Sequence, residues 1–132
     1  MHSSLGDGGM PLLGALGLTF ESYGAGWAEA TWLPTELACN PHGGVHGGVF
    51  GVVHDAAMNF AVNSALESGD RATTLDVSYQ TIRPASAADG LSVRGEVVRL
   101  AKQVGYAEST VRNADGGVVS RGSATFLLRR RD

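Results

Sequence analysis

The chain has 132 residues, of which 43% are hydrophobic and 17% charged, and its formal net charge is −3. This length predicts one domain, and the apolar balance excludes an intrinsically disordered chain. The slightly acidic charge excludes a globally basic protein, so we expect no nucleic-acid partner. A single cysteine, Cys39, excludes an internal disulfide and is typical of a reducing compartment. No apolar run approaches the roughly 20 residues of a transmembrane helix, so we expect a cytoplasmic protein with no membrane partner.

The N-terminal part of the chain predicts a leader followed by a hairpin. Residues 1–11 are rich in Gly and Ser and predict a flexible leader, which leaves one domain over 12–132. Two β-prone stretches, 16–23 and 27–33, flank a Gly-Ala-Gly turn and predict a β-hairpin that stops at Pro34.

A long helix is predicted from Gly47 to Ser68. The segment contains no Pro, is rich in Ala, and is followed by Gly69, a residue type favoured just after a helix. Apolar residues recur at helical spacing and small residues fill much of the remaining surface, which predicts a buried helix.

After this helix the apolar period changes from about 3.6 residues to 2, which predicts strands. They are expected over 72–83, 91–100, 104–112 and 118–129, followed by a solvated arginine-rich tail. A hairpin, one long helix and then four strands predict an α+β fold, an antiparallel sheet with a single central helix. Such a sheet leaves edges and a face uncovered, so we expect a homo-oligomer.

One carboxylate, Asp55, lies about two turns inside the apolar helix. A buried carboxylate costs several kcal/mol or more, so a chain keeps one only with partners or a task. Gly51 and Asn59 lie four residues before and after it and share its face. We expect Gly51 to leave room for a ligand and Asn59 to hold a water or the carboxylate. A structural acid is the alternative interpretation of Asp55.

The start of the same helix is a candidate binding site for a substrate oxygen. The helix begins at Gly47-Gly48, just after His46, and its first N–H groups have no intrahelical partner and carry the positive end of the dipole. Two glycines let a substrate oxygen approach closely, as in an oxyanion hole. A carbonyl held there, with the carboxylate of the same helix aimed at its carbon, suits acyl transfer to water.

These residues resemble a known family. The chain carries Asn40-Pro41, then His46-Gly47-Gly48, then Asp55 nine positions after the His, and it continues with Thr74, Tyr79 and Arg83-Pro84. This pattern, over about residues 36–128, resembles the hotdog-fold thioesterases. Within them it is similar to the phenylacetate-type (PaaI-like) acyl-CoA thioesterases, relatives of 4-hydroxybenzoyl-CoA thioesterase.

The resemblance implies a hotdog fold and hydrolysis of an aryl, phenylacetyl or medium-chain acyl-CoA to free acid and CoA. It implies that Asp55 is general base or nucleophile and that Gly47 N–H stabilises the oxyanion. His46 and Asn40 would orient the thioester or the water, whereas Asn59 departs from the Ser or Thr that relatives often carry there. It further implies active sites assembled across a dimer, often within a homotetramer, and no metal or redox cofactor.

Other polar residues are candidates for contacts with the substrate. Gly48, Asn59 and Arg83 are the expected substrate-binding residues. CoA phosphates bind Arg and Lys well. The candidates for them are Arg83, Arg99, Lys102, Arg121 and residues 129–131.

Two other functions stay open at this point. One is a non-catalytic acyl-CoA or acyl-carrier binding module on the same fold, which the departure at Asn59 favours. The other is a dehydratase, but such relatives pair Asp and His a few residues apart, whereas His54 and Asp55 are adjacent and point to different helix faces. His54 is therefore expected in the core or an interface. The spacing of His42, His46, His54 and Asp55 matches no standard zinc site, and we expect no metal.

Overall fold

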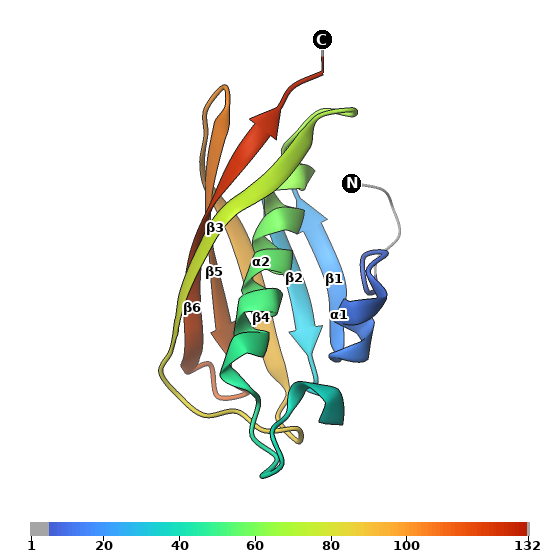
Figure 1. Ribbon diagram of the computed structural model, residues 1–132, viewed down its shortest axis with the longest axis vertical. Coiled ribbons are helices and arrows are strands. Elements are labelled where there is room, and N and C mark those ends of the chain that lie inside the picture. The colour runs from blue at the N-terminus through green and yellow to red at the C-terminus, as the bar shows by residue number, and fades with distance from the viewer. Residues whose placement is uncertain (1–5, 132) are drawn as a thin grey trace.

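The computed structural model describes residues 6–131, which form a six-stranded antiparallel sheet curved around one long helix (Figure 1). The elements in chain order are α1 (Pro11–Ala15), β1 (Leu18–Gly24), β2 (Trp27–Trp32), the short 3-10 helix η1 (Glu36–Ala38), α2 (Gly47–Ser64), β3 (Arg71–Thr81), β4 (Leu91–Leu100), β5 (Val104–Arg112) and β6 (Val118–Arg129). The strand order is β1-β2-β4-β5-β6-β3, and α2 contacts all six strands. The predicted α+β hotdog architecture is confirmed.

The observed strand bounds agree closely with the predicted ones, and a turn explains the difference at β1. β4, β5 and β6 have the predicted bounds, whereas β3 covers 71–81 instead of 72–83. β1 begins at Leu18, two residues later than predicted, because Gly17 adopts a positive φ of 94° between α1 and β1. A Cβ on Gly17 would lie 1.9 Å from the carbonyl oxygen of Leu33, so only glycine fits this turn.

Part of the predicted leader packs on the sheet. Residues 1–5 lie outside the described residues. Gly6 bridges to Phe20 of β1, where Phe20 N–H donates to the Gly6 carbonyl at 2.7 Å. Pro11 begins α1, a position at which its fixed φ is favourable, and Leu13 of this helix is 1% exposed.

The predicted end of the long helix is wrong by four residues. α2 stops at Ser64, whose hydroxyl donates to the Ala61 carbonyl at 2.6 Å and accepts from Gly26 N–H at 2.9 Å. This side chain ties the last turn of α2 to the β1–β2 turn. Gly69 has the expected positive φ, but it lies in the turn that follows, after Ser68.

The core lies between α2 and the concave face of the sheet. Phe50 and Met58 of α2 are 2% and 0% exposed and belong to this core. Phe60 stacks on Phe20, with ring centroids 3.8 Å apart. No helix within residues 6–131 is long and apolar enough to cross a membrane.

Gly95 sets how closely α2 approaches β4. A Cβ at this position would lie 2.4 Å from the Ala57 carbonyl oxygen in the helix backbone. Gly95→Ala is therefore expected to lower the free energy of unfolding by about 1–3 kcal/mol, the usual cost of overpacking. Urea denaturation would measure this. Gly90→Ala is the matched control, since its nearest neighbour, a Leu33 methyl, is at an ordinary 3.8 Å.

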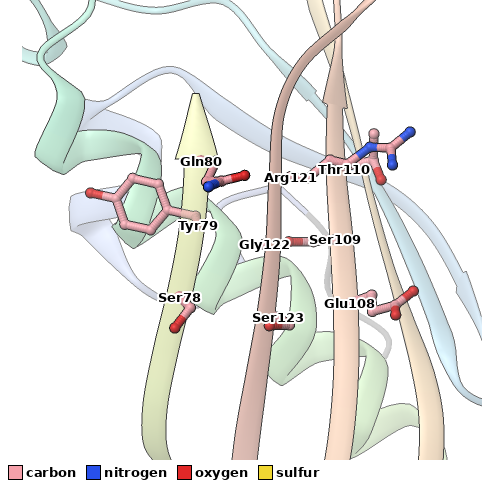
Figure 2. A pocket seen from close by; sticks show the side chains of 9 residues that line it. All are labelled: Ser78, Tyr79, Gln80, Glu108, Ser109, Thr110, Arg121, Gly122 and Ser123. Carbon is pink, nitrogen blue, oxygen red and sulfur yellow. The ribbon is translucent and has the colours of Figure 1, made fainter. Parts of the chain in front are cut away.

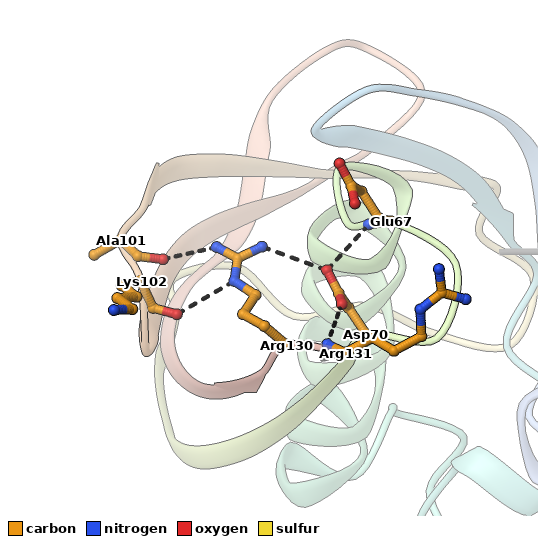
Figure 3. A network of polar contacts seen from close by, with 6 residues as sticks. All are labelled: Glu67, Asp70, Ala101, Lys102, Arg130 and Arg131. Atoms are coloured by element: carbon orange, nitrogen blue, oxygen red, sulfur yellow. Dashed lines mark hydrogen bonds and ion pairs between the residues drawn. The ribbon is translucent and has the colours of Figure 1, made fainter.

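Residues 129–131 are exposed, as predicted for a solvated tail, and Arg130 and Arg131 are in addition bonded to two turns of the fold (Figure 3). Arg130 donates to the carbonyls of Ala101 and Lys102 at 2.8 and 3.2 Å, and it lies 3.6 Å from the carboxylate of Asp70. Arg131 N–H donates to the same carboxylate at 2.7 Å, and this bond is the largest cause of the lowered pKa of Asp70. The network joins the end of β6 to the α2–β3 and β4–β5 turns.

Candidate active site

Asp55 lies on the half-buried face of α2, beside strand β3. The Thr74 hydroxyl donates to one carboxylate oxygen of Asp55 at 2.7 Å. No other hydrogen bond to this carboxylate occurs within residues 6–131, so its second oxygen is available to a ligand or water. Thr74 immediately precedes a β-bulge at Leu75, which interrupts the ladder at the edge of the sheet. The helix is thus not buried all round, because Asp55 and Asn59 are half-exposed.

The start of α2 presents one unpaired amide. His46 is the N-cap, and its Nδ1 accepts from Gly48 N–H at 3.0 Å. In the neutral ring the proton is therefore at Nε2. Gly48 N–H is occupied, whereas Gly47 N–H has no protein acceptor among the described residues. A Cβ on Gly47 would meet nothing within 4 Å, so a substrate oxygen can reach this amide.

Tyr79 of β3 fills the space that the sequence analysis assigned to a ligand. A Cβ on Gly51 would lie 2.9 Å from the Tyr79 ring, so the prediction of open space at Gly51 is wrong. The Tyr79 hydroxyl donates to the Gly47 carbonyl at 3.0 Å and ties the first turn of α2 to β3. Gly51 thus allows an aromatic ring, not a substrate, to lie against the helix.

The other predicted site residues have structural partners. The Asn40 side chain accepts from His42 N–H at 2.9 Å and Gly44 N–H at 3.2 Å, which orders the loop before α2. Asn59 accepts from the Asn63 amide at 2.8 Å rather than bonding Asp55. Arg83 donates from Nε to the Val118 carbonyl at 2.9 Å, and its side chain is exposed.

Asp55 and Gly47 cannot act on one carbonyl from within one chain. They are eight residues apart in α2, which is about 12 Å along a helix that rises about 1.5 Å per residue. The sequence-based picture of both groups acting from the same helix is therefore wrong. Thr74 bonds Asp55, and Tyr79 bonds the Gly47 carbonyl. These two β3 residues are four paired positions apart along the β3–β6 ladder. Both residues belong to the family pattern, but the sequence alone predicts no role for them.

A separate hollow of about 710 Å³ lies over β3, β5 and β6, with α2 behind the strands (Figure 2). Asp55, Thr74 and Gly47 do not line it. Within residues 6–131, no three His, Cys, Asp or Glu side chains gather as metal ligands. The lining residues are Ser78, Tyr79, Gln80, Glu108, Ser109, Thr110, Arg121, Gly122 and Ser123.

Comparison with known proteins identifies the family, since the model of the thioesterase superfamily matches residues 42–120. The chain belongs to the thioesterase superfamily. This thioester hydrolase shares 26% identity with AziG of S. sahachiroi, with a TM-score of 0.87 over 92% of this chain and 98% of that one. It shares 26% with the E. coli PaaI protein from the phenylacetic acid degradation operon, with a TM-score of 0.81 over 94% and 86%.

A hypothetical thioesterase from Streptococcus pneumoniae, solved with coenzyme A, is 21% identical, with a TM-score of 0.79 over 86% and 87% of the two chains. A search of the curated proteins finds no match. The predicted resemblance to PaaI-like hotdog thioesterases is confirmed.

Proposed function

We propose that this thioesterase hydrolyses an acyl-CoA, with an aryl, phenylacetyl or medium-chain acyl group, to the free acid and CoA in the cytoplasm. The observation that carries the proposal is the Asp55 carboxylate, which Thr74 holds by one oxygen and which keeps the other oxygen available. The fold it shares with a thioesterase solved with coenzyme A supports the substrate class.

The chemistry needs a base or nucleophile and an oxyanion donor. As a base, Asp55 takes a proton from water while the water oxygen attacks the thioester carbonyl carbon. The carbonyl oxygen becomes an oxyanion that accepts from Gly47 N–H. Collapse breaks the carbon–sulfur bond, and the CoA thiolate takes up the proton. If Asp55 instead attacks the carbonyl carbon, the carbon–sulfur bond breaks, CoA leaves as its thiolate and a mixed anhydride forms. Water then hydrolyses the anhydride, which regenerates the Asp55 carboxylate and releases the acid, and the proton from water goes to the thiolate.

A two-fold dimer through the edge of β3 brings the two groups together. β3 pairs with β6 on one side, and no described strand pairs with its other edge, where Leu75 is 56% exposed. Val77 is midway between Thr74 and Tyr79 on the ladder. An antiparallel β3–β3 pair centred on Val77 sets Thr74 of each chain opposite the partner's Tyr79. Asp55 then lies level with the partner's Gly47, and two such dimers give the proposed tetramer.

This register predicts a specific cross-link. In a Cys39→Ser background, Val77→Cys is expected to form an intermolecular disulfide rapidly under mild oxidation, because directly opposed Cα atoms lie about 4.5–5.5 Å apart. Non-reducing electrophoresis would measure the dimer band. Thr73→Cys is the control, since that residue is exposed on the same strand but would lie ~20 Å from its copy. Equal cross-linking of the two variants would contradict the register.

Thiol release tests the activity itself. Wild-type protein is expected to release CoA from at least one member of a panel of aryl-, phenylacetyl- and medium-chain acyl-CoAs. Asp55→Ala should lower the rate by about 100-fold or more, the usual contribution of a catalytic base. Equal rates for the two proteins would reject the mechanism. Tight calorimetric binding of intact ester without thiol release would instead support the non-catalytic binding module.

A further inference from the structure

The core contains one polar cluster, and the proposed mechanism does not use it. Within residues 6–131, the buried polar side chains are His54 of α2, Ser109 of β5 and Ser120 of β6. His54 Nδ1 is hydrogen-bonded to the Ser109 hydroxyl, and its Nε2 lies 2.8 Å from the Ser120 hydroxyl. Both ring nitrogens of one helix residue are therefore bonded to two neighbouring strands.

The donors in this cluster can be assigned by counting protons. The Ser120 hydroxyl has one proton, which it donates to the Gln80 carbonyl at 3.1 Å. With this proton given to Gln80, Ser120 accepts from His54, an arrangement that favours the tautomer with the proton at Nε2. Burial lowers the pKa of His54 to about 4, so the ring is neutral near pH 7. Its Nδ1 then accepts from Ser109, and Thr81 donates to Ser120 across 3.1 Å.

The imidazole ring also touches the elements that hold the proposed site. A Cβ on Gly122 would lie 2.8 Å from His54 Cγ, so the glycine lets the ring lie directly on β6. Figure 2 shows Tyr79, Gly122 and Ser109 side by side on β3, β6 and β5. The ring centroids of His54 and Tyr79 are 5.6 Å apart. Tyr79 in turn bonds Gly47, and Asp55 is the next residue of the helix.

We propose that His54 is a positioning residue, whose neutral Nε2–H imidazole fixes the rotation and height of α2 over β5 and β6. An apolar side chain of similar size would fill the same space, but it has no directional bonds to prevent the helix from sliding. A shift of α2 would move Asp55 relative to Thr74 and Gly47 N–H relative to the substrate. This inference rests on the proposed hydrolysis, because its effect on the reaction passes through those two groups.

The test compares four variants of the full-length protein: His54→Leu, His54→Gln, Ser109→Ala and Ser120→Ala. His54→Leu is expected to lower kcat by about 10- to 100-fold, since a displacement near 1 Å costs about that much, while KM changes by less than about threefold. His54→Gln places an amide donor near Ser120 and should recover part of kcat. Ser109→Ala and Ser120→Ala, which barely change core volume, should each lower kcat by less than His54→Leu.

Nitrogen NMR of the His54 ring gives a readout that does not need turnover. The wild-type protein should show the Nε2–H tautomer at neutral pH, and Ser120→Ala should shift the ring toward a mixture of tautomers. An Nδ1–H tautomer in the wild type, or wild-type kcat in both His54→Leu and Ser120→Ala, would overturn the proposal. If no ester of the panel is hydrolysed, the proposed function fails, and the tautomer measurement still decides the His54 arrangement.

Discussion

Co-expression of two inactive variants, Gly47→Pro and Asp55→Asn, is expected to restore about a quarter of wild-type turnover. Random pairing makes about half of the dimers mixed, and each mixed dimer has one site with both groups intact and one with both lost. This follows only if each site takes Gly47 from one chain and Asp55 from the other. The proposed mechanism requires that arrangement, because the two residues are about 12 Å apart along α2.

The Gly47 substitution removes one N–H while keeping the helix. Proline is favoured at the first helical position, and His46 before it has φ −65° and ψ 132°, an extended conformation that proline accepts. Gly47→Pro should therefore lower kcat by about 100- to 1,000-fold, the usual loss for one oxyanion donor. Gly47→Ala is the matched control, since it keeps the N–H and its Cβ enters open space. It should lose far less.

The mixed population must be isolated for a clear result. Two different affinity tags on the two variants allow purification of the assemblies that contain both chains. If these are dimers, turnover is expected at about half the wild-type value, because one of two sites is intact. In the proposed tetramer, which can also join two unmixed dimers, it is expected a little above a quarter. Mixed dimers without activity would place both groups in one chain or assign other roles to them. High activity of either variant alone would remove that residue from the mechanism.

The strand bounds can be predicted from the sequence more accurately than the surroundings of the site. β4, β5 and β6 were predicted with their observed bounds because polar turns at 101–103 and 113–117 separate long alternating segments. Gly69 predicts that α2 ends at residue 68, four residues later than its observed end at Ser64. The stop depends on Ser64 bonding the β1–β2 turn, a contact across 38 residues that no local pattern reveals.

The same limit applies to the site. Asp55 and Gly47 stand out in the sequence because a carboxylate in an apolar helix and glycines at a helix start are locally unusual. Their supports, Thr74 and Tyr79, reach α2 across 19 and 32 residues, once β3 has folded along it. Gly51 was interpreted as open space because the ring that covers it comes from β3. Local pattern thus identifies the groups that the proposed mechanism uses, and topology decides what surrounds them.

Acidification from pH 6.5 to about 4 is expected to cost the folded protein about 3 kcal/mol through His54. Burial lowers the pKa of this ring from its ordinary value of 6.5 to about 4 in the folded state. Between these values the unfolded chain binds a proton that the folded chain does not, so the unfolded state is favoured as pH falls. Each pKa unit is about 1.4 kcal/mol, and His54 is fully buried, so the effect is not screened by solvent.

Urea denaturation at pH 7 and pH 4.5, at one fixed protein concentration, measures this loss. His54→Leu has no such proton to bind, so its unfolding free energy should change less between the two pH values by about 2–3 kcal/mol. The lowered pKa of Asp70 acts in a separate window, since its contribution is lost only below its ordinary value of 3.8. The same pH dependence in both proteins would mean that folding does not lower the pKa of His54, and a ring that stays neutral down to about pH 4 would be excluded.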